Sequence, residues 1–202
     1  MNVESKKNVE IELRLLAKIQ ENKNISQRSI SKELNVALGF ANSLVKKFVK
    51  KGFLKLKHAP MQRFFYYVTP RGLIEKSRLT KEYFQSSLNF YKKARLDFEQ
   101  IFKFLKTKKA QNVYLIGTGE ICEIAILTSN LENVKIGKIY DENFDKNQFY
   151  GISVENSFGS IVSRKKSFYI LCESFDPNGS YKKLSFLKDN ILTPEFMMIN
   201  RK

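Results

Sequence analysis

The segment from Lys81 to Lys108 contains neither glycine nor proline, and this uninterrupted run divides the chain into two halves. Side chains recur along it at alternating intervals of four and three residues: Phe84, Leu88, Tyr91, Arg95, Phe98, Phe102 and Leu105. This heptad spacing predicts one long helix with an apolar seam. Arg95 occupies one position of the seam, where a charge lowers stability but can fix the register by pairing with an acid such as Glu99 of a partner.

The excess positive charge lies entirely before the end of this run. Residues 1–109 contain 25 Lys and Arg against 9 Asp and Glu, whereas the remaining residues contain 11 of each. No acidic residue occurs between Leu34 and Ile74. A surface that faces a polyanion needs this distribution, so we expect nucleic-acid contact in that stretch.

Composition excludes several other classes of protein. No apolar run is long enough to span a membrane and the amino terminus lacks a signal-peptide core, which predicts a cytoplasmic protein without membrane contact. Cys122 and Cys172 are expected to be buried thiols, and the single His58 is expected in a turn. These residues support neither a metal site nor a catalytic residue.

The basic half has the pattern of three helices followed by a β-hairpin. Apolar residues at helical spacing predict helices over residues 9–22, 27–35 and 37–51, with Ser26 capping the second helix and Gly52 ending the third. The period then changes to two, and a turn at residues 59–62 separates the two expected strands. Thr69 and Pro70 are expected to cap and begin the next helix. This is the pattern of a winged helix-turn-helix domain.

Two segments, SQRSISKELNVALGFANSLVKKFVKKGFLKL and VTPRGLIEKSRLTKEYF, resemble the MarR-like winged-helix family, and more narrowly the small regulators that accompany exopolysaccharide gene clusters. The resemblance covers roughly residues 10–90. It implies that the third helix enters the major groove of double-stranded DNA. The residues that it places near base edges are Ala37, Gly39, Phe40, Asn42, Ser43 and Lys46.

Within this set, Asn42 is assigned to adenine and Phe40 to thymine methyl groups. The phosphate contacts are assigned to Lys47, Lys50, Lys55, Lys57 and Arg63. The alternative interpretation is that the lysines form a solvated face and that Phe40 belongs to the core. For the long helix we favour pairing between two chains, because a homodimer would present two recognition helices to a two-fold operator. The alternative is that its seam packs on its own domain.

The neutral half begins with the pattern strand, glycine turn, helix. Asn112 to Ile116 form an apolar strand that runs into Gly117-Thr118-Gly119-Glu120, and a helical pattern follows from Ile121. Such a turn brings backbone N–H groups to a phosphate at the start of a helix. The third glycine of the dinucleotide fingerprint would fall at Cys122, so the fingerprint is incomplete.

A second expected strand, residues 134–140, ends in Tyr140 and Asp141, either of which could bind ribose hydroxyls. Further strands near residues 151–154, 167–172 and 196–199 complete a small parallel sheet of five strands, with a helix over residues 179–189.

The segments GTGEICEIA, KIYDEN and FYGISV resemble the Rossmann-like domains of nucleotide-sugar enzymes and of CoA- or NAD-binding proteins. The resemblance implies a nucleotide-type ligand on Gly117, Thr118, Gly119, Glu120, Ile121, Tyr140 and Asp141. Glu120 departs from an ideal phosphate site because its carboxylate would repel a phosphate. A Rossmann fold with a vestigial pocket is the alternative.

Together these patterns predict an α+β winged helix-turn-helix domain over residues 1–80, a linker and dimerisation helix over 81–109, and an α/β Rossmann-like sensing domain over 110–202. This domain order is similar to that of the Rex redox-sensing repressors. We expect a non-enzymatic transcriptional regulator whose effector is a nucleotide sugar or, as second candidate, NAD(H). The alternatives are a nucleotide-sugar enzyme with an attached winged helix and a protein-interaction adaptor.

Overall fold

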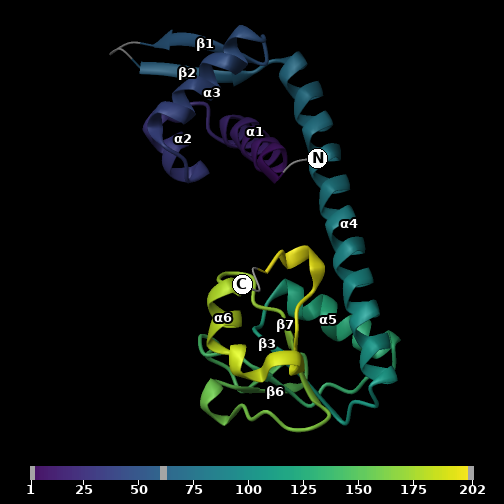
Figure 1. The fold of residues 1–202 in the computed structure, drawn as a ribbon. Coiled ribbons are helices and arrows are strands. Elements are labelled where there is room, and N and C mark those ends of the chain that lie inside the picture. Colours follow the sequence, from purple (N-terminus) through teal and green to yellow (C-terminus); the bar gives the residue numbers. More distant parts are fainter. Residues whose placement is uncertain (1–2, 60–62, 200–202) are drawn as a thin grey trace. The chain divides into compact units, whose positions relative to one another are not determined.

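The computed structural model describes residues 3–59 and 63–199, and the chain forms two compact units, Met1–Leu88 and Asn89–Lys202 (Figure 1). The first unit consists of α1 (Val3–Glu21), α2 (Gln27–Leu34), α3 (Leu38–Lys50), β1 (Leu54–Ala59), β2 (Arg63–Val68) and the beginning of α4 (Pro70–Thr107). β1 and β2 pair as an antiparallel hairpin, with Leu54 opposite Val68 and Ala59 opposite Arg63. The predicted order of three helices and a hairpin is confirmed.

Local signals set the ends of these elements. Ser26 caps α2 by accepting a hydrogen bond of 3.1 Å from the backbone N of Ser29. Gly52 follows α3 with φ of 73°, a left-handed conformation that glycine adopts without steric cost. Thr69 caps α4, since its hydroxyl accepts a hydrogen bond of 3.0 Å from Gly72 N, and Pro70 is the first helical residue.

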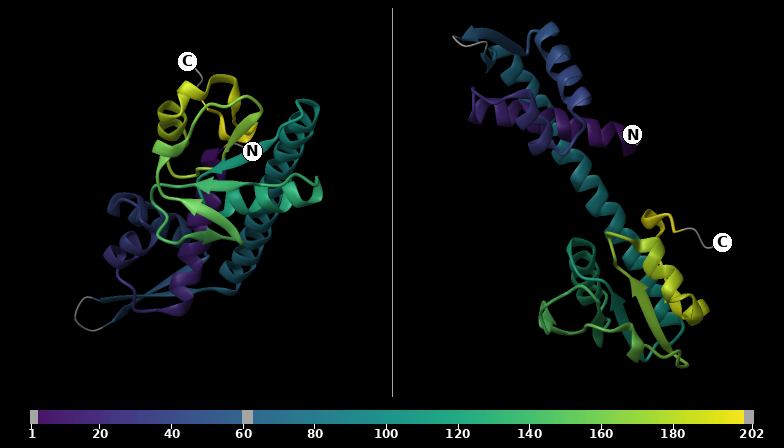
Figure 2. Two further views of the ribbon diagram at one scale, coloured as in Figure 1. Left: turned by 90° about the horizontal axis from the view of Figure 1, so that it is seen from below. Right: turned by 90° about the vertical axis from the view of Figure 1, so that its left-hand side faces the viewer.

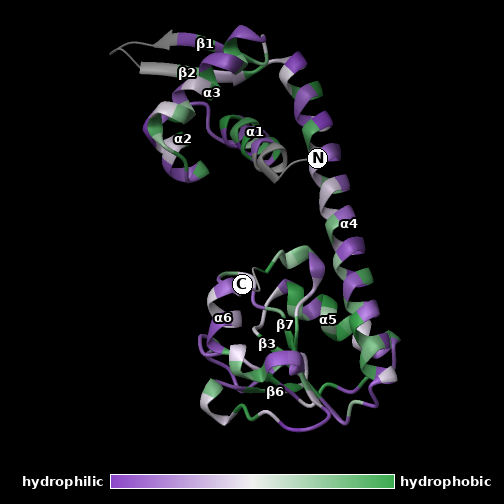
Figure 3. Cartoon of the chain, viewed as in Figure 1, coloured by the Kyte–Doolittle hydropathy of each residue, from purple (hydrophilic) through white to green (hydrophobic). Residues whose placement is uncertain are grey.

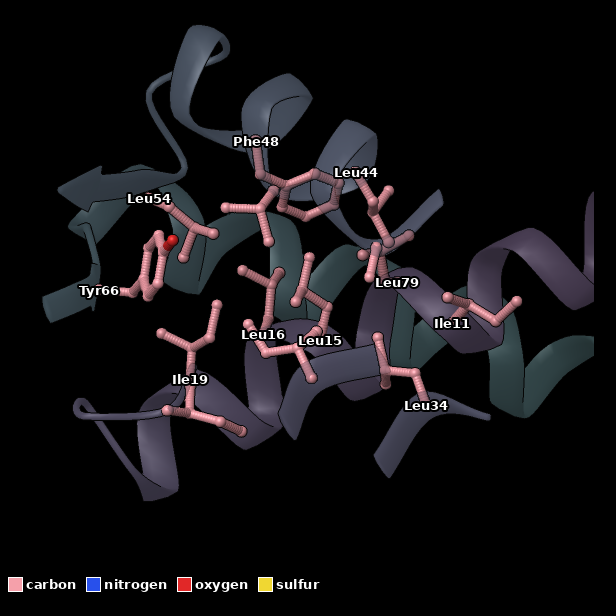
Figure 4. Close-up of a cluster of buried hydrophobic side chains, with 14 of the residues drawn as sticks. Ile11, Leu15, Leu16, Ile19, Leu34, Leu44, Phe48, Leu54, Tyr66 and Leu79 are labelled. Carbon is pink, nitrogen blue, oxygen red and sulfur yellow. The ribbon is translucent and has the colours of Figure 1, made fainter. Parts of the chain in front are cut away.

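One apolar core holds the first unit together. Leu15, Leu16 and Ile19 from α1 are fully buried and belong to one cluster with Phe48 from α3 (Figure 4). Leu79 of α4 is also fully buried in this cluster, so the first turns of the long helix are part of the domain. Burial of one large apolar side chain stabilises the folded state by about 1.5 to 3 kcal/mol. The core therefore holds α3 in a fixed orientation within this unit.

The second unit is built on a six-stranded sheet with the strand order β5-β6-β4-β3-β7-β8. Neighbouring strands are parallel except for the β5–β6 pair, which is antiparallel. The bounds of the strands are β3 (Asn112–Ile116), β4 (Lys138–Tyr140), β5 (Gln148–Phe149), β6 (Ile152–Glu155), β7 (Ser167–Leu171) and β8 (Ile191–Leu192). The predicted fold class, an α/β domain with a mostly parallel sheet after a winged helix and a long helix, is confirmed.

Helices cover both faces of this sheet (Figure 2). On one face, Phe98 and Phe102 of α4 and Ala125 of α5 (Glu120–Leu131) join a cluster with strand residues such as Leu115. Leu184, which follows α6 (Pro177–Lys183), and Leu187, in a 3-10 turn, belong to the cluster on the other face. In Figure 3 most of α5 has the green colour of hydrophobic residues. All five residues of β7 are buried, as expected for a parallel strand covered on both faces.

Four strand details differ from the sequence-based expectation. His58, expected in a turn, lies in β1 opposite Phe64. The second strand begins at Lys138, four residues later than expected. The expected strand at 196–199 is wrong: Glu195–Met197 form a 3-10 turn, and the last parallel strand is instead Ile191–Leu192. Pro194 precedes that turn and Met198 ends it with φ of 48°, so the chain bends where a strand would have to be extended. β5, which the sequence pattern did not reveal, adds the antiparallel edge.

The long helix runs without a break from Pro70 to Thr107 over 38 residues, so the two helices expected around residue 80 are one. Only the carboxyl-terminal half of its seam is covered: Phe98 and Phe102 are fully buried in their own unit. Phe84 is 61% exposed, and Leu88 and Tyr91 are exposed to about 40%. The alternative in which the seam packs on its own domain therefore applies to one half of it.

The two cysteines are free and buried, as expected. Burial, together with the neighbouring Cys122 thiol, raises the pKa of Cys172 well above its ordinary value. None of the helices in the described residues combines the length and hydropathy that a membrane span needs.

Candidate DNA interface and ligand cavity

Helix α3 has one buried face and one open face. Its buried residues are Ala41, Leu44, Val45 and Phe48. At its start, Ala37 occupies the N-cap position without a side-chain hydrogen bond, and the first turn contains no acidic residue. The free N–H groups and the positive end of the helix dipole are thus left open to an anion.

Most of the residues predicted to face base edges lie on the open face of α3. Ala37, Gly39, Ser43 and Lys46 are exposed, and Phe40 is 44% exposed rather than part of the core. Asn42 differs from them. It is half-buried, and its Oδ1 is a buried acceptor for which no hydrogen-bond partner exists in residues 3–59 and 63–199. To read adenine with both amide atoms, the Asn42 side chain would have to turn outward.

The lysines predicted to bind phosphates separate into two groups. Lys50, with Lys46 one turn before it, lines a groove of about 320 Å³ between α3 and the wing, whose apolar wall includes Val49 and Leu56. Lys47 lies on the opposite flank, where its Nζ is 2.6 Å from the Glu12 Oε1 of α1. Lys47 is therefore partly neutralised, while Lys46 and Lys50 stay available for phosphates.

The wing adds further cations. Lys55 and Lys57 are exposed on β1, and the Lys57 Nζ lies 5.4 Å from the centre of the Tyr67 ring. The Lys23 Nζ lies 5.6 Å from the same ring, although sequence reasoning did not include it. Lys23 comes from the α1–α2 loop, which is held to β2 by a hydrogen bond from Tyr66 N to Lys23 O of 3.1 Å. Arg63 lies on β2 opposite Ala59, and its side chain is outside the described part.

In the second unit, a cavity of about 560 Å³ opens where β3, β4 and β7 end. Its lining comes from the three loops that leave these strands and from α6: Thr118, Asp141, Asn143, Phe144, Glu173, Phe175, Asp176, Gly179, Ser180 and Lys183. Of the residues predicted to bind a nucleotide, only Thr118 and Asp141 line it. Phe175 is 97% exposed at this site.

The glycine turn after β3 is closed by protein groups. Asp141, only 7% exposed, accepts hydrogen bonds from Thr118 N at 2.8 Å and from the Thr118 hydroxyl at 2.6 Å. Gly117 has φ of 93°, and a Cβ there would lie 2.7 Å from the backbone of Glu173. The glycine is therefore required by the close approach of the two loops. Gly119 has φ of 99° with open space around its Cα.

The remaining predicted ligand residues point elsewhere or lie at the helix start. Tyr140 is buried beside the stacked rings of Tyr114 and Tyr169, at centroid distances of 5.8 and 6.1 Å, and burial raises its pKa. Glu120 is exposed at the beginning of α5, and Ile121 is half-buried.

Negative charge dominates the cavity. Asp141, Glu173 and Asp176 all line it, while Lys183 forms an ion pair of 2.8 Å with Glu142. The Glu142 carboxylate raises the pKa of Lys183. A phosphate placed here would be repelled by three carboxylates and attracted by the single ammonium group among the lining residues, that of Lys183.

Residues 10–55 match the family model of winged helix-turn-helix DNA-binding domains. The match includes most of α1, all of α2 and α3, and the first residues of β1. No curated protein matches the chain. Among solved structures, the chain is similar to Streptococcus pneumoniae FabT in complex with DNA, with 21% identity over 60% of this chain and 69% of that chain. The TM-score of that likeness is 0.32, which is too low to carry an inference about either unit.

In the winged helix-turn-helix domain, Lys46 and Lys50 of α3 lie at the α3–wing groove. Lys55, Lys57 and Lys23 gather on the opposite face of the hairpin, since successive side chains of a strand point to opposite faces and Leu56 and Tyr66 face the groove. Lys47 lies on the flank that faces α1, and Phe40 and Ser43 line the same hollow there. Lys23 could have been found only from the fold, because no local pattern connects residue 23 with a strand more than 40 residues later.

Proposed function

We propose that this chain is a DNA-binding regulator of transcription. One observation carries the proposal: the open face of α3 and the wing present lysines on a surface whose chain segment, Leu34 to Ile74, contains no acid. The family match over residues 10–55 supports the same function. In this arrangement the start of α3 and Lys46 meet base edges, and Lys50, Lys55 and Lys57 neutralise phosphates.

Dimerisation would complete this function in the way that MarR-like regulators require. The exposed stripe of Phe84, Leu88 and Tyr91 continues the seam that is buried further along α4. Large exposed apolar side chains on one helical face are typical of a protein interface. A second copy of the chain would cover the stripe and supply a second recognition helix for a two-fold operator.

A small-molecule effector would bind in the cavity of the second unit. Two features support this role. The five parallel strands follow the order third, second, first, fourth, fifth, which is that of Rossmann-like sheets. The cavity also lies at the carboxyl ends of the strands, beside the point where the order reverses. A nucleotide sugar, with a link to surface polysaccharide synthesis, is the first candidate and NAD(H) the second. Their phosphates would have to displace Asp141 from Thr118.

The decisive experiment measures binding of the purified chain to its own promoter region by fluorescence anisotropy, over a salt series and with competitor DNA. Specific binding that weakens steeply with salt is expected. Lys46→Glu should lower the affinity by roughly tenfold or more, because it replaces a base- or phosphate-facing cation by an anion. Lys182→Glu, an exposed change of equal charge on α6, is the control. No preference over competitor DNA would refute the regulator function.

A further inference from the structure

The second unit contains 18 Lys and Arg against 13 Asp and Glu, and the sheet separates these charges in space. The loops that enter parallel strands all lie at the amino edge of a sheet. The loops into β3, β4 and β7 contain only basic residues among their exposed charges: Lys108, Lys109, Lys135, Arg164, Lys165 and Lys166.

Contacts show that these loops are neighbours. Lys166 O accepts hydrogen bonds from Gln111 N at 2.9 Å and Asn112 N at 3.3 Å, which joins the loop before β7 to the loop before β3. Lys106 and Lys135 line the same hollow of about 240 Å³, which joins the loop before β4 to the end of α4. Six strand-entering cations therefore form one surface, which we name the amino-edge surface.

Acidic residues are fewer at this surface than at the opposite edge. The loop before β8, which Asn190 joins to Arg164 O by a hydrogen bond of 3.4 Å, adds the exposed Asp189 together with Lys188. Glu132, beside the hollow, is engaged by Lys106 at 2.7 Å, so it does not neutralise the loop cations. The loops that leave β4 and β7 carry Asp141, Glu142, Asp145, Glu173 and Asp176. One edge of the sheet thus attracts a polyanion, and the other repels it.

We infer that the amino-edge surface is a second contact for the phosphate backbone of DNA, separate from the winged helix. The inference rests on the proposed function, because the winged helix tethers the second unit near DNA and raises its effective concentration there. The charge separation allows only the amino edge to turn toward phosphates. Such contacts supply affinity without reading sequence.

The test compares two double variants of the full chain. Lys135→Gln with Lys165→Gln removes two charges from different loops of the amino-edge surface. Lys146→Gln with Lys182→Gln removes two exposed lysines outside it, from the loop after β4 and from α6. Binding to a long promoter duplex is measured by anisotropy at several salt concentrations. Each lost phosphate contact lowers the slope of log K against log salt by about 0.9, so the first variant should lose between about 1 and 2.

The control variant should keep the wild-type slope. Equal slopes for the wild type and the amino-edge variant would overturn the inference. A second result would also overturn the inference. If the amino-edge variant loses binding to phosphatidylserine vesicles while its DNA slope stays unchanged, the surface binds a membrane and not DNA. Failure of the wild type to bind DNA, by contrast, would refute the regulator function itself. If the wild type binds and Lys46→Glu weakens that binding while the amino-edge variant keeps the wild-type slope, the regulator function stands and only the second contact is refuted.

Discussion

The Asp141 carboxylate accepts two hydrogen bonds from Thr118, 2.8 Å from its backbone N and 2.6 Å from its hydroxyl. A residue at the end of β4 thereby occupies the amide that a glycine turn of this kind would offer to a phosphate. Its other oxygen accepts from Asn143 N at 2.9 Å. Asp141 therefore ties together two of the loops that line the cavity.

Replacing Asp141 with Asn should destabilise the second unit. The amide keeps the shape of the side chain, but it removes the charge and leaves one backbone or hydroxyl donor without an acceptor. The expected loss is about 1 to 3 kcal/mol in the free energy of unfolding, measured by urea denaturation. Asp145→Asn, at an exposed position of the same loop, should change stability by less than about 0.5 kcal/mol. Equal stabilities of the two variants would show that the Asp141 contacts are dispensable.

The ion pair between Lys47 and Glu12 makes a different prediction for two adjacent lysines. Lys47→Glu would place two carboxylates where a 2.6 Å ion pair now joins α3 to α1, so it should lower the melting temperature of the first unit. Lys46 forms no ion pair with the described residues, so Lys46→Glu should weaken DNA binding with little change in melting temperature. Calorimetry and anisotropy on both variants check this. A lower melting temperature for Lys46→Glu alone would contradict the assignment.

Two buried tyrosines predict how the second unit responds to alkali. Burial raises the pKa of both Tyr140 and Tyr169 above the ordinary value of 10.0. The unfolded chain therefore loses these protons at lower pH than the folded chain does. The contribution of these two tyrosines to stability should be constant below pH 10 and should be lost as pH rises through their raised pKa values. Tyr140→Phe should reduce this alkaline loss, measured as the urea midpoint at pH 9 and pH 11, and an unchanged loss would exclude Tyr140 as its source.

Much of the fold is predictable because local chemistry determines it. Ser26, Gly52 and Thr69 are each capping residues with a specific hydrogen bond or backbone conformation, so the helix boundaries could be placed from the sequence. The apolar period distinguishes α3 from the wing in the same way. The strands of the second unit were harder, because β5 and β8 span two residues each and gain their hydrogen bonds only from neighbours distant in the chain.

The sites depend on contacts that no local pattern contains. The open face of α3 follows from helical periodicity, and hence its exposed residues could be predicted. The partner of Lys47 lies 35 residues earlier in the chain, and the partner of Thr118 lies 23 residues later. The charge separation in the second unit also escapes a sequence count, since residues 135 and 165 reach the same edge of the sheet only when the strands pair in parallel.

The exposed stripe on α4 predicts a dimer that single substitutions can weaken. Phe84 is 61% exposed and Leu88 is 42% exposed, four residues apart and so on one face of the helix. Glu at either position would put a charge into an apolar contact between two copies, so Phe84→Glu with Leu88→Glu should shift the chain from dimer to monomer in sedimentation equilibrium. Phe102→Glu is not a suitable control because Phe102 is fully buried. Lys93→Glu is suitable, because Lys93 is exposed on the opposite face of the same helix. If the stripe pairs two chains, the double variant should also lose affinity for a two-fold operator but keep affinity for a half-site. A wild-type monomer at micromolar concentration would refute pairing through α4.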